Sequence, residues 1–113
     1  MEIKENEFIR TKTGKIDKVI NNNYYMSQYI ECEKRIVEKE NIVKHSFNII
    51  DLIEVGDIVN GYRIDERAEY DVLIHKARGI NRSGFMIPVA QYNEDIKTIL
   101  THEQYERNCY KIN

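Results

Sequence analysis

The sequence predicts a small, mainly β protein, α+β at most: an antiparallel SH3-like barrel or rolled sheet with one or two short helical turns. Short segments rich in Ile, Val and Tyr recur about every 8 to 12 residues and are separated by Gly, Asn and Asp. With 113 residues the chain is long enough for one core but not for two, so we expect a single domain over residues 1–113. The composition, 42% hydrophobic and 32% charged, is typical of an ordered globular protein.

The central segment SFNIIDLIEVGDIVNGYRI carries the strongest structural signal in the chain. Asn48 can cap a helical turn over Ile49–Ile53. Gly56 suits a positive-φ position at the entry to a strand, and the alternating pattern predicts one continuous strand over Ile58–Ile64. We expect one of the first two residues of that strand to lie in the core.

The N-terminal half is expected to be rich in β-structure. Glu7–Ile20 has the pattern of a hairpin that turns at Gly14, with Phe8 and Ile16 on the core side. The stretch Tyr24–Ser46 fits helical spacing, and its Tyr-, Ile- and Val-rich pieces also fit two strands. We favour strands for this stretch.

The C-terminal half shows strand and turn signals in alternation. The segment YDVLIHKA predicts a strand, RGINRSG an exposed loop, and FMIPVAQY an edge strand, because Pro88 has no backbone N–H to donate. Asn93–Asp95 predicts a turn. Thr101 and Gln104 have the spacing of a capping box, which predicts one turn of helix through about Arg107. The segment CYKI predicts a closing strand.

Three of these segments together carry a resemblance: FIRTKTGKIDKVI, NIIDLIEVGDIVNGYRI and IKTILTHEQYERNCYKI. They resemble a group of small uncharacterised proteins of phages and prophages of Firmicutes. The resemblance covers roughly half of the chain and does not extend through Tyr24–Glu40. It implies a phage-type origin and a mostly β fold, and it assigns no catalytic residue.

From this resemblance and the small size we expect a non-enzymatic accessory protein that binds and inhibits a host protein. A defence effector is the partner we consider first, which would make the chain an anti-CRISPR or other anti-defence inhibitor. The alternative is a nucleic-acid-binding small β-barrel in phage regulation. The net charge of −2 argues against this alternative, because general nucleic-acid binders are normally basic.

Aromatic and basic side chains are the leading candidates for partner binding, because Tyr and Arg are over-represented among interface hot spots. Three tyrosines gather beside a run of asparagines, and the RGINRSG region is the most basic local site. The partner-binding candidates are Tyr24, Tyr25, Tyr29, Lys76, Arg78 and Arg82.

The sequence offers no recognisable metal or catalytic motif. His45, His75 and His102 have no cysteine or second histidine at the spacing of metal ligands, and GINRSG lacks the Lys and Ser/Thr of a phosphate-binding loop. We therefore expect no catalytic residue, no metal and no cofactor. Cys32 and Cys109 are expected to be reduced thiols.

The predicted location is the cytoplasm of a bacterial host. No apolar run approaches the roughly 18 residues that a membrane span needs, and the N-terminal segment MEIKENEF has no signal-peptide core. We therefore expect no membrane partner. The sequence leaves the oligomeric state open.

Overall fold

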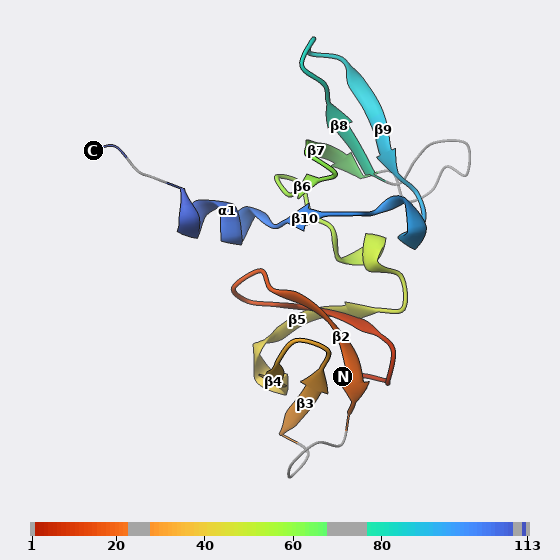
Figure 1. Ribbon diagram of the computed structural model, residues 1–113, viewed down its shortest axis with the longest axis vertical. Coiled ribbons are helices and arrows are strands. Elements are labelled where there is room, and N and C mark those ends of the chain that lie inside the picture. The colour runs from red at the N-terminus through yellow and green to blue at the C-terminus, as the bar shows by residue number, and fades with distance from the viewer. Residues whose placement is uncertain (1, 23–27, 68–76, 110–111, 113) are drawn as a thin grey trace. The chain divides into compact units, whose positions relative to one another are not determined.

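The computed structural model describes residues 2–22, 28–67, 77–109 and 112 (Figure 1). The chain divides into two compact units, unit 1 from Met1 to Leu52 and unit 2 from Ile53 to Asn113. Each unit contains a five-stranded antiparallel sheet, so the predicted mainly β, antiparallel class is confirmed. The expectation of a single domain stays a prediction.

The sheet of unit 1 has the strand order β4-β3-β2-β1-β5. Its elements are β1 (Phe8–Thr11), β2 (Ile16–Asn21), β3 (Tyr29–Cys32), β4 (Ile36–Glu38), the 3-10 turn η1 (Lys39–Asn41), β5 (Ile42–Ser46) and the 3-10 turn η2 (Ile49–Leu52). The hairpin around Gly14 is confirmed, with φ of 83° at the glycine. The strand interpretation of the next stretch is also confirmed over residues 28–46, where three strands form instead of two.

The core of unit 1 lies on the opposite face of the hairpin from the one predicted. Ile9 and Val19 are buried, whereas Phe8 and Ile16 are only partly covered. Phe8 lies opposite Lys18, whose ammonium sits 5.7 Å from the centre of the Phe8 ring. Because successive strand residues point to opposite faces, this pairing directs Ile9 inward. The core cluster is Ile3, Ile9, Val19, Ile30, Cys32, Val37 and Ile42.

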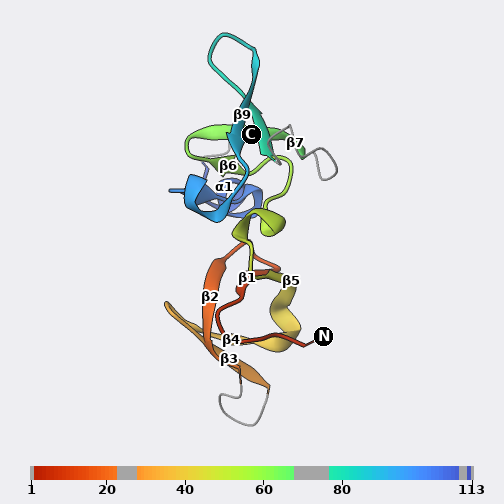
Figure 2. The same ribbon diagram turned by 90° about the vertical axis from the view of Figure 1, so that its right-hand side faces the viewer.

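The sheet of unit 2 has the strand order β10-β6-β7-β8-β9. Its elements are β6 (Ile58–Val59), β7 (Tyr62–Arg67), β8 (Ala77–Ile80), β9 (Met86–Ala90), the 3-10 turn η3 (Asn93–Asp95), β10 (Ile99–Leu100) and the helix α1 (His102–Asn108). The predicted edge position of Pro88 and the capping box of Thr101 and Gln104 are both confirmed. Within unit 2, the tip of the β8–β9 hairpin extends away from α1 in both views (Figures 1 and 2).

The prediction of one continuous strand over Ile58–Ile64 is wrong. Asn60 and Gly61 form a tight turn with φ of 53° and 85°, and β6 and β7 pair as a hairpin on either side of it. Asn-Gly is one of the dipeptides favoured where two successive residues have positive φ, so the turn has a clear local cause.

The predicted loop RGINRSG is shorter than expected, because Arg78, Gly79 and Ile80 belong to β8. Residues 70–76 of the predicted strand YDVLIHKA, and residues 110–111 of CYKI, lie outside the described residues.

The two residues of β6 provide a direct test of the core of unit 2. Val59 is fully buried and Ile58 is only partly buried. We expect Val59→Asp to lower the free energy of unfolding by at least about 3 kcal/mol, because it places an unpaired charge in an apolar interior. Ile58→Ala should cost less than about 2 kcal/mol. Urea denaturation of both variants measures the difference, and equal losses would contradict this assignment of the core.

Cys32 provides a second test, of the core of unit 1. Both cysteines are free. Burial, reinforced by the nearby Asp17 carboxylate, raises the pKa of Cys32 from 9.0 to about 11. Because the folded state holds this proton more tightly, the free energy of unfolding should be unaffected below about pH 9 and should fall between about pH 9 and 11.

Denaturation of the wild type and Cys32→Ala across this pH range isolates the contribution of the thiol. The variant should lose less stability than the wild type as the pH rises. Identical pH profiles for the two proteins would show that the Cys32 thiol is not protected by the fold.

Candidate functional site

The buried carboxylate of Asp57 joins the segment before β6 to the start of α1. Oδ2 of Asp57 accepts a hydrogen bond from the backbone N–H of Glu54 at 2.7 Å, and Oδ1 accepts one from the N–H of His102 at 2.9 Å. The second bond connects residues 45 positions apart in the sequence. Asp57 is fully buried, and a buried carboxylate is stable only when such donors surround it. These bonds therefore fix the backbone of Glu54 and of His102.

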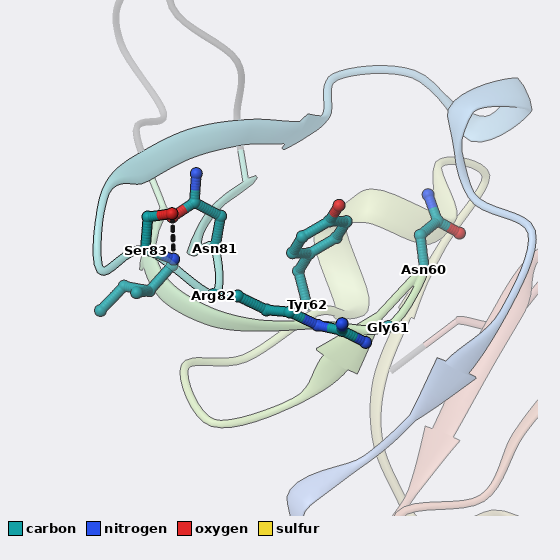
Figure 3. Close-up of a pocket in the computed structure, with 7 residues that line it drawn as sticks. Asn60, Gly61, Tyr62, Asn81, Arg82 and Ser83 are labelled. Atoms are coloured by element: carbon teal, nitrogen blue, oxygen red, sulfur yellow. Dashed lines mark hydrogen bonds between the residues drawn. The ribbon is translucent and has the colours of Figure 1, made fainter.

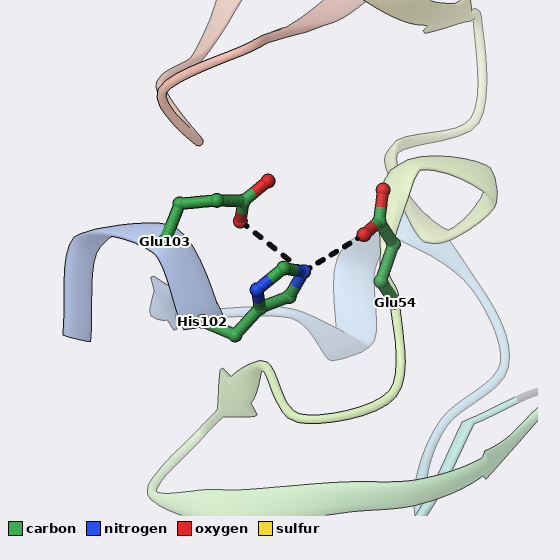
Figure 4. A group of neighbouring side chains, drawn as sticks. All are labelled: Glu54, His102 and Glu103. Carbon is green, nitrogen blue, oxygen red and sulfur yellow. Dashed lines mark hydrogen bonds and ion pairs between the residues drawn. The ribbon is translucent and has the colours of Figure 1, made fainter. Parts of the chain in front are cut away.

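Three side chains meet next to this anchor: Glu54, His102 and Glu103, which we call the Glu-His-Glu cluster. Nε2 of His102 lies 2.8 Å from Oε1 of Glu54 and 3.4 Å from Oε1 of Glu103. Figure 4 shows the imidazole between the two carboxylates. Gly56 has φ of +96°, and a Cβ atom there would lie 3.4 Å from Cβ of His102. That distance is an ordinary van der Waals contact, so the positive φ, and not lack of space, is what favours glycine at this position.

A second feature of unit 2 is a surface hollow of about 610 Å³, which we call the Tyr62 hollow. Its lining residues come from the β6–β7 turn and the β8–β9 turn. They are Asn60, Gly61, Tyr62, Ile80, Asn81, Arg82 and Ser83. Figure 3 shows the Tyr62 ring between the Asn81–Ser83 turn at one end and Asn60 at the other.

Two asparagine side chains stabilise the walls of the Tyr62 hollow. Nδ2 of Asn60 donates to the carbonyl of Asp95 at 2.7 Å, and its Oδ1 accepts from the N–H of Lys97 at 2.7 Å. Oδ1 of Asn81 accepts from the N–H of Phe85 at 3.0 Å, inside the β8–β9 turn. Asn side chains commonly complete turns in this way. Both rims of the hollow are therefore held by hydrogen bonds to the backbone.

The aromatic ring of the hollow lies beside a close approach of two strands. A Cβ atom on Gly79 would lie 2.6 Å from the carbonyl oxygen of Arg63 and 3.2 Å from Cβ of Tyr62, so only glycine fits between them. Tyr62 is 39% exposed, and Phe85 in the adjoining turn is 68% exposed. The hollow thus presents the accessible ring of Tyr62 together with the exposed Arg82.

The predicted partner-binding residues do not form one site in the structure. Arg82 lines the Tyr62 hollow, and Arg78 lies in β8 opposite Pro88. Tyr29 belongs to β3 of unit 1, where its hydroxyl donates to Oε1 of Glu38 at 3.5 Å. The candidates outside the described residues are Tyr24, Tyr25 and Lys76.

Sequence reasoning missed Tyr62 and the Glu-His-Glu cluster. The Asn60–Gly61 dipeptide could have revealed the turn that places Tyr62 in the hollow. The cluster has no such local signal, because Glu54 and His102 are 48 positions apart. The sequence prediction named only cysteine and histidine as possible neighbours of the histidines, and the structure instead places two carboxylates beside His102.

No family model, curated protein or solved structure matches the chain. Within the described residues, no helix has the length and apolar character to cross a membrane. The resemblance to phage proteins stays a prediction.

Replacing Asp57 tests whether its carboxylate holds the site together. Asp57→Asn keeps the size but turns an amide N–H₂ toward a backbone N–H, so we expect a loss of about 1.5–3 kcal/mol in the free energy of unfolding. The matched control is Asp65→Asn, which removes a 3.3 Å ion pair with the exposed Arg63 and should cost less than about 1 kcal/mol. Urea denaturation compares the two, and equal costs would contradict the anchoring role of Asp57.

Proposed function

We propose that this chain is a non-enzymatic accessory protein that binds another protein through the Tyr62 hollow. The observation that carries the proposal is the exposed Tyr62 ring and the exposed Arg82 that line one hollow with hydrogen-bonded walls. The sequence resemblance further implies that this partner is a host protein, such as a defence effector. Binding then inhibits that protein.

The apolar part of this surface supports a protein partner. Tyr62 lines the hollow and is 39% exposed, and Phe85 and Met86, which follow the Asn81–Ser83 turn, are 68% and 38% exposed. A partner that covers such apolar side chains removes them from water, which favours binding. Aromatic residues and arginine also contribute more to interface free energy than most other residue types.

The basic part of the surface defines the chemistry of the partner. The Arg82 guanidinium is exposed and forms no hydrogen bond or ion pair with any residue in the described part of the chain. A carboxylate can pair with this group in a bidentate geometry. The complementary partner therefore presents an Asp or Glu beside an apolar side chain that packs on Tyr62.

A nucleic-acid partner is the second candidate, because an aromatic ring and a guanidinium share the same hollow. Single-stranded nucleic acids bind to surfaces of this kind, where bases stack on aromatic side chains and cations contact phosphates. The net charge of −2 provides little general attraction for a phosphate backbone, so this candidate ranks second.

A capture experiment from bacterial lysate with matched variants tests the protein-binding proposal. Tyr62→Ala and Arg82→Ala should each weaken capture of the partner at least about tenfold, since a hot-spot truncation costs about 2 kcal/mol or more. The matched controls are Tyr105→Ala and Arg107→Ala, which remove exposed side chains of the same types from α1 and should leave capture unchanged. Equal capture by all four variants would contradict the proposal.

Shift assays with DNA and RNA at two salt concentrations separate the two candidates. Binding to phosphates should weaken steeply with salt, with a slope of about −0.7 to −0.9 per phosphate contacted. Salt-sensitive nucleic-acid binding that is lost in Arg82→Ala would favour the second candidate. Multiple turnover of a small substrate would contradict both.

A further inference from the structure

We propose that the Glu-His-Glu cluster is a binding site for a divalent transition-metal cation, with Zn²⁺ as the best match. This inference goes beyond the protein-binding proposal, because it involves different residues of unit 2 and a different ligand. The proposed ligand atoms are Oε1 of Glu54, Nε2 of His102 and Oε1 of Glu103.

The spacing of these atoms is close to that of a tetrahedral metal site. A zinc ion about 2.0–2.2 Å from each ligand requires ligand atoms roughly 3.3–3.6 Å apart. In the cluster, Nε2 of His102 lies 2.8 Å and 3.4 Å from the two carboxylate oxygens, and all three atoms lie within 4.8 Å of one another. Shifts of less than about 1.5 Å in the side chains would therefore complete the first coordination sphere.

Two carboxylates facing one imidazole nitrogen offer three ligand atoms to a cation. Nε2 carries at most one proton, which it can only share between the two carboxylate oxygens 2.8 Å and 3.4 Å away. A divalent cation at this position accepts a lone pair from all three atoms and balances both negative charges. The side chains of His102, Glu54 and Glu103 are 40%, 28% and 23% exposed, so an ion can enter from solvent.

The backbone at two of the three ligands is already fixed before a cation binds. The buried Asp57 carboxylate accepts from the N–H groups of Glu54 and His102 at 2.7 Å and 2.9 Å. The capping box of Thr101 and Gln104 sets the start of the helix that carries His102 and the third ligand, Glu103. Binding therefore requires the ordering of side chains more than of backbone, which lowers its entropy cost.

The donor set selects among cations. Imidazole nitrogen is a good ligand for Zn²⁺ and a poor one for Mg²⁺ and Ca²⁺, which prefer oxygen atoms throughout. Both imidazole nitrogen and carboxylate oxygen bind Zn²⁺ in proteins. Three protein ligands leave the fourth tetrahedral position to water.

Calorimetric titration of the chelator-treated chain with ZnCl₂ tests the site. We expect binding of one ion per chain to wild type. Replacing a residue that only contacts a metal ligand typically lowers metal affinity about tenfold or more. Loss of a ligand itself should cost at least as much. Zinc affinity should therefore fall by about tenfold or more in each of Glu54→Gln, Glu103→Gln and His102→Ala. MgCl₂ should bind far more weakly than ZnCl₂.

Two matched controls address binding elsewhere on the chain. Glu106→Gln removes an exposed carboxylate from the same helix, and His45→Ala removes a histidine that lies 3.0 Å from a single carboxylate, that of Glu7. Both should bind Zn²⁺ like wild type. The glutamine variants preserve side-chain shape, and circular dichroism checks their fold. Absence of zinc binding by wild type, or equal binding by folded Glu54→Gln and Glu106→Gln, would overturn the proposal.

Discussion

The buried carboxylate of Asp57 is the interaction on which the organisation of unit 2 depends. Removing a carboxylate from water is costly unless hydrogen bonds replace the lost hydration, and two backbone N–H groups do so here. One of them begins α1, a helix of seven residues that is too short to be stable from its own hydrogen bonds. Asp57 therefore stabilises both the entry to β6 and the start of the helix, and the Glu-His-Glu cluster follows from that arrangement.

The Tyr62 hollow depends on a different device, a pair of turns that are closed by asparagine side chains. Asn60 bonds to the segment before β10, and Asn81 bonds inside the β8–β9 turn. A rim fixed in this way loses less conformational entropy when a partner binds, so more of the contact energy contributes to affinity. The two candidate sites of unit 2 thus share one sheet but use separate anchors.

Local signals were sufficient to predict several parts of this fold. The positive φ at Gly56, the edge position of Pro88 and the capping box at Thr101 follow from the chemistry of single residues and their close neighbours. The prediction of a continuous strand over Ile58–Ile64 was wrong because the alternating pattern was given more weight than the Asn-Gly turn signal. Alternation alone also could not choose between the two faces of the first hairpin.

The sites were less predictable than the fold. Local composition identified Arg82, because a basic loop can be recognised without knowing what surrounds it. The pairing of Glu54 with His102 could not be predicted, since it joins residues 48 positions apart through a carboxylate that has no sequence signature of its own. The Asn60–Gly61 turn that places Tyr62 in the hollow has a local signal. The close approach of Gly79 to Arg63 and Tyr62 has none in the linear sequence.

Residue-resolved amide hydrogen exchange tests most directly whether Asp57 anchors unit 2. The N–H groups of Glu54 and His102 lie at a segment boundary and in the first turn of a short helix, where intrahelical partners are absent. If the Asp57 carboxylate holds them as the structure indicates, both amides should exchange as slowly as the N–H of Ile64, which donates to the carbonyl of Asp57 at 2.8 Å. Exchange of both at the rate of an unprotected amide would contradict the account.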